Sequence, residues 1–533
     1  MRATLMTRGL VAGFAIFAGV AALAPAAVAQ VTAFKQAVAV AAAEDDDLAA
    51  FYRDGGYQPI WVGDDADDRA RREALLSIVG KADLHGLPRG RYDADTLRDL
   101  MTSARSERDR GRVEVELSRL FLRFATDLET GILTPAQVDN NIKREVPTRD
   151  RLALLRAFES ARPNTFLNNL APASAEYTRL VREKVKLERL IADGGWGGPL
   201  TVGKLSPGDT GDAVIALRDR LIAFGYLDRS DTRLYDASMT RAVEQFQADH
   251  GLVQDGIVGG DTLTEMNRSP VDRLGHILVS MERERWMNRD LGDRHVSVNL
   301  TDFRAKIMVD GEIFFQTKSV IGKDQDGRRT PEFSDEMDHM VINPSWYVPR
   351  SIVVNEYLPQ LRRNPYALSY MEITDSRGRK VNRGRGFSQY TARSFPFSMR
   401  QPPSDRNALG LVKFMFPNKY NIYLHDTPAK NLFSRDVRAF SHGCIRLNDP
   451  FEFGYALLSM QTDDPEGEFQ RHLRSGRESR VNLENPLPVH IIYRTAIAKP
   501  EGGMEYRRDV YGRNGRVLAA LMRAGVVLPG AQS

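Results

Sequence analysis

The spacing of apolar residues predicts three structural units along the chain. From about residue 48 to residue 191, apolar side chains recur every three to four positions. The clearest run is Leu117, Leu120, Phe121, Phe124 and Leu128. This period is typical of amphipathic helices that bury one face. We therefore predict a mostly helical scaffold domain over residues 48–195 and interpret its apolar stripes as structural packing.

A second, shorter helical unit is divided by turn residues. Its first apolar run is Val214, Leu217, Leu221 and Phe224, and its second is Ala242, Val243 and Phe246. Gly225 ends the first run, the turn Asp255-Gly256 follows the second, and a third helix is expected to begin near Gly260. The pattern predicts three short helices around one small core over residues 200–267.

After Ser269-Pro270 the period changes from helix to strand. Short β-prone runs occupy residues 295–300, 306–309, 313–321, 340–342, 421–424 and 489–493. They predict a mixed sheet or sandwich over residues 272–495. Residues 353–419 form a basic insertion that contains Pro and Gly, and such long insertions are often lids. The fold class expected for the whole chain is multidomain α+β, with a C-terminal extension, residues 496–533, to which we assign a helix near Leu518 and no chemistry.

The N-terminal pattern is that of a secretory signal. Arg2 and Arg8 precede an uncharged apolar run, and Ala27-Val28-Ala29 has the form of a cleavage site. We predict a signal peptide over residues 1–29, a linker over residues 30–47 and a periplasmic location. The alternative is a retained membrane anchor, since the uncharged stretch is about as long as the ~20 residues that a span needs.

Charge and length exclude some functions. The net charge of +4 falls to +2 without Arg2 and Arg8, so no strong field favours nucleic acid. At 533 residues the chain is several times longer than a typical domain of ~100–200 residues. We therefore expect several domains, and membrane contact only through the N-terminal segment.

Cys444 is the single cysteine of the chain and the strongest chemical signal. It lies in the run Ser441 to Leu447, nineteen residues after His425. A free cysteine is often only a small buried hydrophobe. In an oxidising compartment, however, structural cysteines are normally paired, and Gly443 lets backbone N–H groups approach a reacting carbonyl. We therefore interpret Cys444 as a nucleophile.

Two sets of motifs resemble known families. Pro207-Gly208-Asp209, Gly225-Tyr226-Leu227, residues 242–247, Gly251-Leu252 and Asp255-Gly256 resemble the three-helix peptidoglycan-binding module. This resemblance implies wall targeting, with a structural spacer as the alternative.

The second set lies in the β-rich region. Residues 423–428 followed by residues 438–447 resemble the signature of L,D-transpeptidases with a YkuD-type catalytic domain. Residues 343–349, 407–410 and 413–418 are similar to the YcbB-like branch, which combines a helical scaffold, a peptidoglycan-binding module, the catalytic β-domain and an inserted capping subdomain.

The resemblance implies roles for individual residues. Cys444 would be the nucleophile and His425 the general acid/base, oriented by the backbone carbonyl of Asp426. The N–H groups of Gly443 and Cys444 would stabilise the oxyanion. The implied substrate-binding residues are Arg446, Tyr423, His442 and Trp346. A structural ion pair remains the alternative for Arg446, and His442 varies with Ser in the family.

The implied reaction is a two-step acyl transfer on peptidoglycan. Cys444 would attack the carbonyl between diaminopimelate and the terminal D-Ala of a tetrapeptide stem, and an amine of another stem would resolve the thioester. Water as acceptor would give an L,D-carboxypeptidase, and a protein lysine a lipoprotein anchor. A non-catalytic wall-binding scaffold is a further alternative. A papain-like hydrolase is disfavoured because its nucleophile precedes its histidine, whereas here His425 comes first.

No metal or other cofactor is expected. The expected partners are stem peptides and glycan, with cell-wall synthases as candidates, and not nucleic acid.

Overall fold

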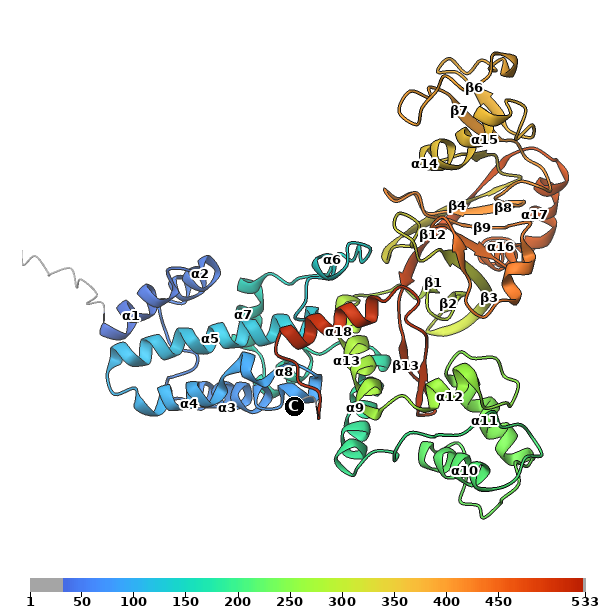
Figure 1. Ribbon diagram of the computed structural model, residues 1–533. Coiled ribbons are helices and arrows are strands. Elements are labelled where there is room, and N and C mark those ends of the chain that lie inside the picture. The colour runs from blue at the N-terminus through green and yellow to red at the C-terminus, as the bar shows by residue number, and fades with distance from the viewer. Residues whose placement is uncertain (1–31, 531–533) are drawn as a thin grey trace, which may run out of the picture.

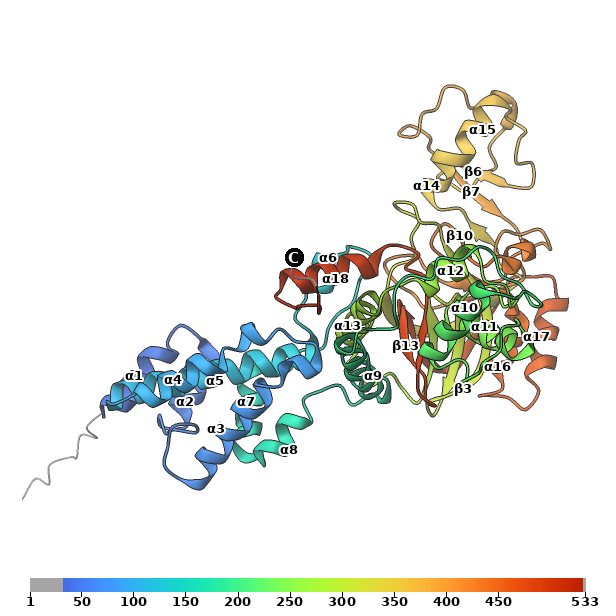
Figure 2. The ribbon, with the colours of Figure 1, turned by 60° about the horizontal axis from the view of Figure 1, so that its bottom comes forward.

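The computed structural model describes residues 32–530. A helical unit forms one end of an elongated molecule, and a β-rich domain and a three-helix module form the other (Figure 1). The helices α9, α13 and α18 lie between these parts in both views (Figure 2). The architecture is multidomain α+β, as predicted.

The helical unit is built around α5 (Glu107–Thr130), which is buried along most of its length. Ser106 begins this helix with a capping box in which its side chain and that of Asp109 each accept from the other residue's backbone N–H. The other helices of the unit and of its connection are α1 (Ala33–Ala42), α2 (Asp46–Asp54), α3 (Ala66–Val79), η1 (Ala82–His85), η2 (Arg89–Tyr92), α4 (Ala94–Ser103), α6 (Pro135–Val138), α7 (Arg151–Ser160), α8 (Pro163–Asn168) and α9 (Ala175–Ala192).

The linker predicted over residues 30–47 is wrong where the structure describes it. Residues 33–42 form α1, which buries Phe34 and Val38 and packs along α5. Gly111 makes this close packing possible, because a Cβ there would lie 2.8 Å from the Cβ of Ala37. The Ala/Val-rich composition therefore fills a helix interface. The predicted signal peptide, residues 1–29, lies outside the described residues.

The three-helix module contains α10 (Asp212–Phe224), α11 (Ala237–Asp249) and α12 (Gly260–Met266). Gly225 ends α10 in the left-handed conformation, and Asp236 caps α11. Gln247 of α11 accepts from the N–H groups of Asp255 and Gly256, so it fixes the turn before α12. The predicted apolar runs form one small core.

The β-rich domain follows α13 (Pro270–Trp286). Its main sheet has the order β10-β3-β11-β9-β8-β4-β12-β1-β2, and β2 pairs back to β3. The strands are β1 (Arg294–Asn299), β2 (Arg304–Val309), β3 (Glu312–Gly322), β4 (Phe333–Ile342), β8 (Val412–Met415), β9 (Leu424–His425), β10 (Ala439–Ser441), β11 (Ile445–Leu447) and β12 (Ser479–Ile492). One face is the apolar core, which includes Ile307, Phe414 and Ile445. The helices outside this sheet in the same stretch are η5 (Lys430–Ser434), α16 (Pro450–Leu458) and α17 (Pro465–Arg474).

The insertion has its own sheet, in the order β5-β7-β6, and its own apolar cluster. Its elements are β5 (Trp346–Tyr347), α14 (Arg350–Ile352), the π-helix η3 (Val353–Tyr357), α15 (Leu358–Arg363), β6 (Glu372–Thr374), η4 (Arg383–Arg385) and β7 (Ser398–Gln401). The predicted limits of 353–419 need correction at both ends. β5 belongs to the insertion, whereas β8 belongs to the main sheet, because Val412 and Phe414 are buried in its core.

The C-terminal extension is integrated into the centre of the molecule. Its hairpin, β13 (Ala496–Ala498) and β14 (Met504–Tyr506), contacts α9, α13 and α11. Its helix α18 (Arg513–Arg523), predicted near Leu518, packs on α13. Within residues 32–530, no helix combines the length and apolarity needed to span a membrane.

Candidate active site

Strand register brings the predicted catalytic residues to one face of the main sheet. β9 and β11 are parallel, with His425 opposite Arg446, and β8 places Lys413 opposite His425. Opposed residues share a face of a sheet, and alternate residues of a strand do so as well. Tyr423 and Cys444 immediately precede the paired residues Leu424 and Ile445, and the Ile445 N–H donates to the Tyr423 carbonyl at 3.0 Å. The thiol and the imidazole therefore lie on the same face of the sheet, outside the apolar core.

His425 is buried and held by a backbone carbonyl. Its Nδ1 lies 2.5 Å from the carbonyl oxygen of Asp426. Because a carbonyl only accepts, this contact makes Nδ1 the protonated nitrogen and leaves Nε2 as the base. Burial, together with the nearby Arg446 charge, lowers the pKa of His425 to about 3. The imidazole is therefore neutral at physiological pH.

The carboxylate of Asp426 points away from this contact. It accepts from the N–H groups of Leu411 (2.9 Å) and Thr427 (2.7 Å) and pairs with Lys430 at 2.9 Å. Gly410, with φ +61°, lies so close that a Cβ there would be 2.2 Å from Oδ2 of Asp426. The carboxylate thus fixes the loop, while the backbone carbonyl orients the histidine.

Cys444 is half-buried, and its thiol is protonated at rest. Its Sγ donates to the carbonyl oxygen of Asn421 at 3.4 Å. Burial raises the pKa of Cys444 to about 11, although Tyr423, Arg446 and Lys413 act in the opposite direction. No thiol–imidazole hydrogen bond forms within residues 32–530. The resting pair is thus a neutral thiol and a neutral imidazole, and the thiol must turn from Asn421 toward His425 to react.

The loop before Cys444 corrects the expectation that the Gly443 N–H is free to stabilise an oxyanion. Gly443 has φ +123°, which favours glycine. Its N–H donates to Oγ of Ser441 at 3.1 Å, and Ser441 Oγ donates to the Cys444 carbonyl at 2.5 Å. The Gly443 N–H is therefore occupied, whereas the Cys444 N–H has no hydrogen-bond partner in the described part of the chain.

Arg446 and Lys413 are two cations beside the thiol that form no ion pair within residues 32–530. Burial lowers the pKa of each, and both interact electrostatically with Cys444. Nε of Arg446 is buried without a hydrogen-bond partner. The alternative, that Arg446 belongs to a structural ion pair, is not supported, because no carboxylate pairs with it within residues 32–530. Lys413 was not predicted as a site residue, because nothing in its own segment indicates that β8 pairs with β9.

Trp346 and Tyr423 form an aromatic wall of the site. The Tyr423 ring lies 5.7 Å from the His425 ring, centroid to centroid. Burial raises the pKa of Tyr423, and Cys444 adds to the effect, whereas a hydrogen bond from the Trp346 side chain acts against it. Trp346 comes from β5, so the insertion contributes directly to this wall.

His442 is turned toward the insertion. Its Nε2 lies 2.6 Å from Oε1 of Glu356, which also accepts from Arg328 at 2.8 Å. Glu356 belongs to η3, so these contacts tie the insertion to the thiol loop. Glu356 and Arg328 are not among the predicted site residues, since each lies far from Cys444 in the chain.

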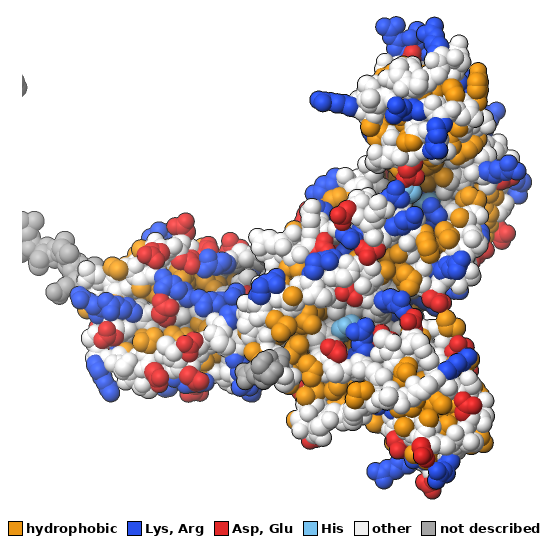
Figure 3. Space-filling model, in the orientation of Figure 1, with side chains coloured by type: hydrophobic (Ala, Val, Ile, Leu, Met, Phe, Trp, Pro, Cys, Tyr) orange, Lys and Arg blue, Asp and Glu red, His pale blue; other side chains and the backbone are white. Residues whose placement is uncertain are grey.

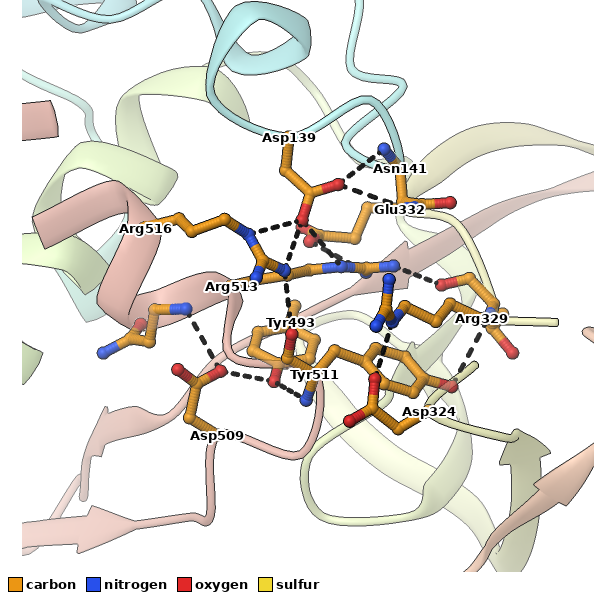
Figure 4. A network of polar contacts seen from close by, with 12 residues as sticks. Asp139, Asn141, Asp324, Arg329, Glu332, Tyr493, Asp509, Tyr511, Arg513 and Arg516 are labelled. Carbon is orange, nitrogen blue, oxygen red and sulfur yellow. Dashed lines mark hydrogen bonds and ion pairs between the residues drawn. The ribbon is translucent and has the colours of Figure 1, made fainter. Parts of the chain in front are cut away.

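A polar network from the C-terminal extension supports the same loop. Oγ1 of Thr330 donates to the carbonyl of Gly443 at 2.7 Å and accepts from the Gly322 N–H at 2.9 Å. Tyr511 accepts from the Thr330 N–H and donates to the Gly322 carbonyl at 2.6 Å. Figure 4 shows Tyr511 within a larger network that reaches Asp139 of the helical unit through Arg516. Within residues 32–530, no three His, Cys, Asp or Glu side chains form a group that could hold a metal ion.

Comparison with sequence profiles of protein families identifies three segments. Residues 293–458 match the L,D-transpeptidase catalytic domain (YkuD), and residues 46–183 match a scaffold domain. Residues 210–266 match a domain provisionally described as peptidoglycan binding. The chain therefore carries an L,D-transpeptidase catalytic domain and a peptidoglycan-binding domain. Its place in the YcbB-like branch stays a prediction.

One curated relative and two solved structures are similar over parts of the chain. A Haemophilus influenzae protein provisionally named an L,D-transpeptidase is 27% identical over 247 residues, which cover 46% of this chain and 50% of the relative. The chain thus matches half the length of that relative.

L,D-transpeptidase structures from Xylanimonas cellulosilytica and Stackebrandtia nassauensis are each 15% identical to this chain. They cover 55% and 56% of this chain and 98% and 97% of their own, with TM-scores of 0.17 and 0.22. At these scores the superpositions support no further argument.

Proposed function

We propose that this chain, with its L,D-transpeptidase catalytic domain and peptidoglycan-binding domain, crosslinks peptidoglycan stems through a thioester on Cys444. The proposed donor is a tetrapeptide stem that ends in diaminopimelate and D-Ala. The observation that carries the proposal is the β9–β11 register, which aligns a carbonyl-oriented neutral imidazole with the single thiol of the chain.

In the first step His425 acts as the general base. Nε2 takes the thiol proton while Sγ attacks the carbonyl between diaminopimelate and D-Ala. The N–H of Cys444, which has no partner in the described residues, donates to the developing oxyanion. The protonated imidazole then gives its proton to the leaving amine, so D-Ala departs and the acyl group remains on sulfur.

The second step reverses the roles. An amine of an acceptor stem attacks the thioester, His425 removes a proton from that amine, and the thiol leaves with a proton restored. Arg446 and Lys413 favour a donor with carboxylates near the scissile bond, because both are half-buried cations without an ionic partner in the described residues. Tyr423 and Trp346 provide an apolar wall for the stem.

The acceptor decides between related reactions that use the same residues. Water would give an L,D-carboxypeptidase, and a protein lysine would give an anchored lipoprotein. Contacts of Trp346 with Tyr423 and of Glu356 with His442 support the crosslinking reaction, because an insertion anchored beside the thiol loop can limit water access to the thioester. The proposed location is the periplasm, where this substrate would be available.

Product analysis tests this function. Purified protein is incubated with disaccharide-tetrapeptide muropeptides, and the products are identified by mass spectrometry. Dimers formed with loss of one D-Ala are the expected result. Tripeptides alone would show a carboxypeptidase, and unchanged substrate would favour a wall-binding scaffold and contradict the proposal.

A further inference from the structure

A large cavity separates the three-helix module from the β-rich domain. Its volume is about 720 Å³, within the usual range for ligand pockets. One wall comes from residues 251–262 of the module, and the opposite wall comes from β2, β3 and the segment before β10. Figure 3 shows Lys and Arg side chains gathered where the module meets the β-rich domain.

Three cations from β2, β3 and the segment before β10 line this cavity and form no ion pair within residues 32–530. Arg304 of β2 lies directly opposite Lys318 of β3. Like charges in such a cross-strand pair are destabilising. Arg438 lies beside them: its guanidinium donates to the backbone carbonyls of Ser319 and Phe303, and burial and the charge of Arg304 both lower its pKa.

The carboxylates of the cavity offset this cluster only in part: the charges of Asp302 and Asp436 act to raise the pKa of Arg438, against burial and Arg304. Asp302 pairs with Lys306 at 4.0 Å, and Asp436 forms no ion pair within residues 32–530. The opposite side adds Lys204, together with Arg507, which pairs with Glu505 at 2.5 Å, and Arg508, which pairs with Asp261 at 2.7 Å. With Asp255 and Asp261 included, four carboxylates and six cations line the cavity. A repulsive cross-strand pair at its wall is explained if a negatively charged ligand binds there.

The cation cluster shares the face of the sheet on which the thiol lies. Lys318 and Val320 are alternate residues of β3, and Val320 is opposite Arg446, which is itself opposite His425. Ordinary strand spacings place the backbone of Lys318 about 8 Å from that of Arg446 and about 14 Å from that of Cys444. An extended tetrapeptide also spans about 14 Å.

We propose that Arg304, Lys318 and Arg438 form an anion subsite that holds carboxylates of a peptidoglycan stem, with the three-helix module as the opposite wall. The subsite would fix a bound strand at one stem length from Cys444. This inference rests on the proposed function, because it takes its ligand class from the same substrate. It also gives the module a role in positioning substrate as well as in wall attachment.

Binding to a protein that cannot turn over isolates the subsite. The Cys444→Ala variant is titrated calorimetrically with disaccharide-tetrapeptide, alone and with Arg304→Gln and Lys318→Gln added. We expect the added pair to weaken binding at least ~10-fold, the size of one lost charge-assisted contact, and to flatten the dependence of affinity on salt. The matched control is Arg294→Gln with Arg480→Gln, which removes two exposed cations of the same sheet away from the cavity.

Two further measurements decide the interpretation. Amidating the stem carboxylates should weaken binding to the parent more than binding to the Arg304/Lys318 variant, which keeps Arg446 and Lys413. The melting temperature should not fall in that variant, since a repulsive pair is removed. Equal affinity in the variant and the control, or no effect of amidation, would overturn the subsite.

Failure of the proposed function gives a different result. A carbapenem should acylate Cys444 in the parent chain and in an Arg304→Gln/Lys318→Gln chain that keeps the thiol. If neither chain is acylated, the thioester mechanism is wrong whatever the binding data show. If both are acylated but the binding difference is absent, only the subsite is wrong.

A second inference rests on the network at Thr330. Thr330 is fully buried, and its hydroxyl fixes the carbonyl of Gly443 immediately before the nucleophile. Tyr511 holds the Thr330 N–H, and Arg513 donates to the Thr330 carbonyl at 2.7 Å. We infer that Thr330, Tyr511 and Arg513 are positioning residues that set the direction of the Cys444 N–H and side chain.

The conservative pair Thr330→Val and Thr330→Ser tests this role. Valine keeps the shape and removes the hydroxyl, whereas serine keeps the hydroxyl. We expect kcat to fall ~10-fold or more in the valine variant with KM little changed, and to recover in the serine variant. Equal rates in the two variants, or a loss that simply follows the unfolded fraction, would overturn the inference.

Discussion

The thiol loop, residues 441–447, and the C-terminal extension, residues 496–530, contribute to one site in different ways. The loop carries the proposed nucleophile and a backbone N–H that has no partner in the described residues. The extension carries none of the proposed reacting groups. Its Tyr511 and Arg513 hydrogen-bond to Thr330, and Thr330 in turn hydrogen-bonds to Gly443. Arg513 is completely buried and lies over the rings of Tyr493 and Tyr511.

In this interpretation, the reacting groups and the hydrogen bonds that fix their positions come from separate parts of the chain. A thiol is recognisable by its residue type, whereas the effect of a tyrosine on a glycine carbonyl exists only in the folded molecule. Variants of the loop should therefore abolish chemistry. Variants of the extension should slow it without changing which residue is acylated.

The largest effect is expected at the nucleophile. Cys444→Ala should remove all turnover and all covalent labelling by a carbapenem, because the chain contains no other thiol. Intact-protein mass spectrometry measures the label directly. A labelled Cys444→Ala protein would show that another residue of the chain reacts.

The next effect is expected at the base. His425→Gln should lower kcat by ~10²–10⁴-fold, the usual contribution of a positioned acid/base, while the fold is retained. The rate of carbapenem acylation tests the loss of proton transfer, and circular dichroism tests whether the fold is retained. A loss under tenfold would assign the proton transfer to a group other than His425.

A smaller effect is expected in the extension. Tyr511→Phe removes a hydroxyl that makes two hydrogen bonds near the loop, each worth about 1 kcal/mol. We expect kcat to fall about tenfold and the label to stay on Cys444. Peptide mapping after acylation checks the site, and an unchanged rate would limit the extension to stabilising the fold.

Asp426→Asn should have a still smaller effect on the rate. The backbone carbonyl that orients His425 remains in this variant, while the ion pair with Lys430 is lost. We expect kcat within about fivefold of the parent and a free energy of unfolding lower by about 1–2 kcal/mol. A loss of kcat equal to that of His425→Gln would make the carboxylate a member of the catalytic machinery.

The smallest change is expected with pH. The neutral thiol and neutral imidazole dominate between the pKa of His425, about 3, and that of Cys444, about 11. Because the reactive form is then the same throughout, the rate constant for Cys444 acylation should stay nearly constant from about pH 5 to about pH 9. A tenfold fall in the rate constant for each pH unit below the ordinary pKa of a thiol would instead show attack by a thiolate ionised by solvent.

The sequence predicted the parts of this molecule that depend on local pattern. The helical and strand periods located the scaffold, the module and most strands, since amphipathic spacing reflects burial directly. The carbonyl of Asp426 lies beside His425, as the family resemblance implied. Helix α1 was missed because an Ala/Val-rich segment without charge alternation looks like a linker until its partner α5 is known.

Long-range contacts could not be predicted in the same way. The pairing of β8 with β9 brings Lys413 to the thiol, and the pairing of β2 with β3 opposes Arg304 and Lys318. His442 was expected at the substrate but contacts Glu356, since the path of η3 is set by tertiary packing. Each of these features depends on which strands or helices become neighbours, and spacing within one segment carries no such information.

Trapping the acyl-enzyme tests the central claim most directly. The protein is mixed briefly with a tetrapeptide stem, quenched in acid and digested, and the peptide that contains residues 441–447 is analysed by mass spectrometry. We expect this peptide to carry the stem minus one D-Ala, bound to Cys444 and released by hydroxylamine. Crosslinked or trimmed product without any adduct on Cys444, or with the adduct on another residue, would contradict it.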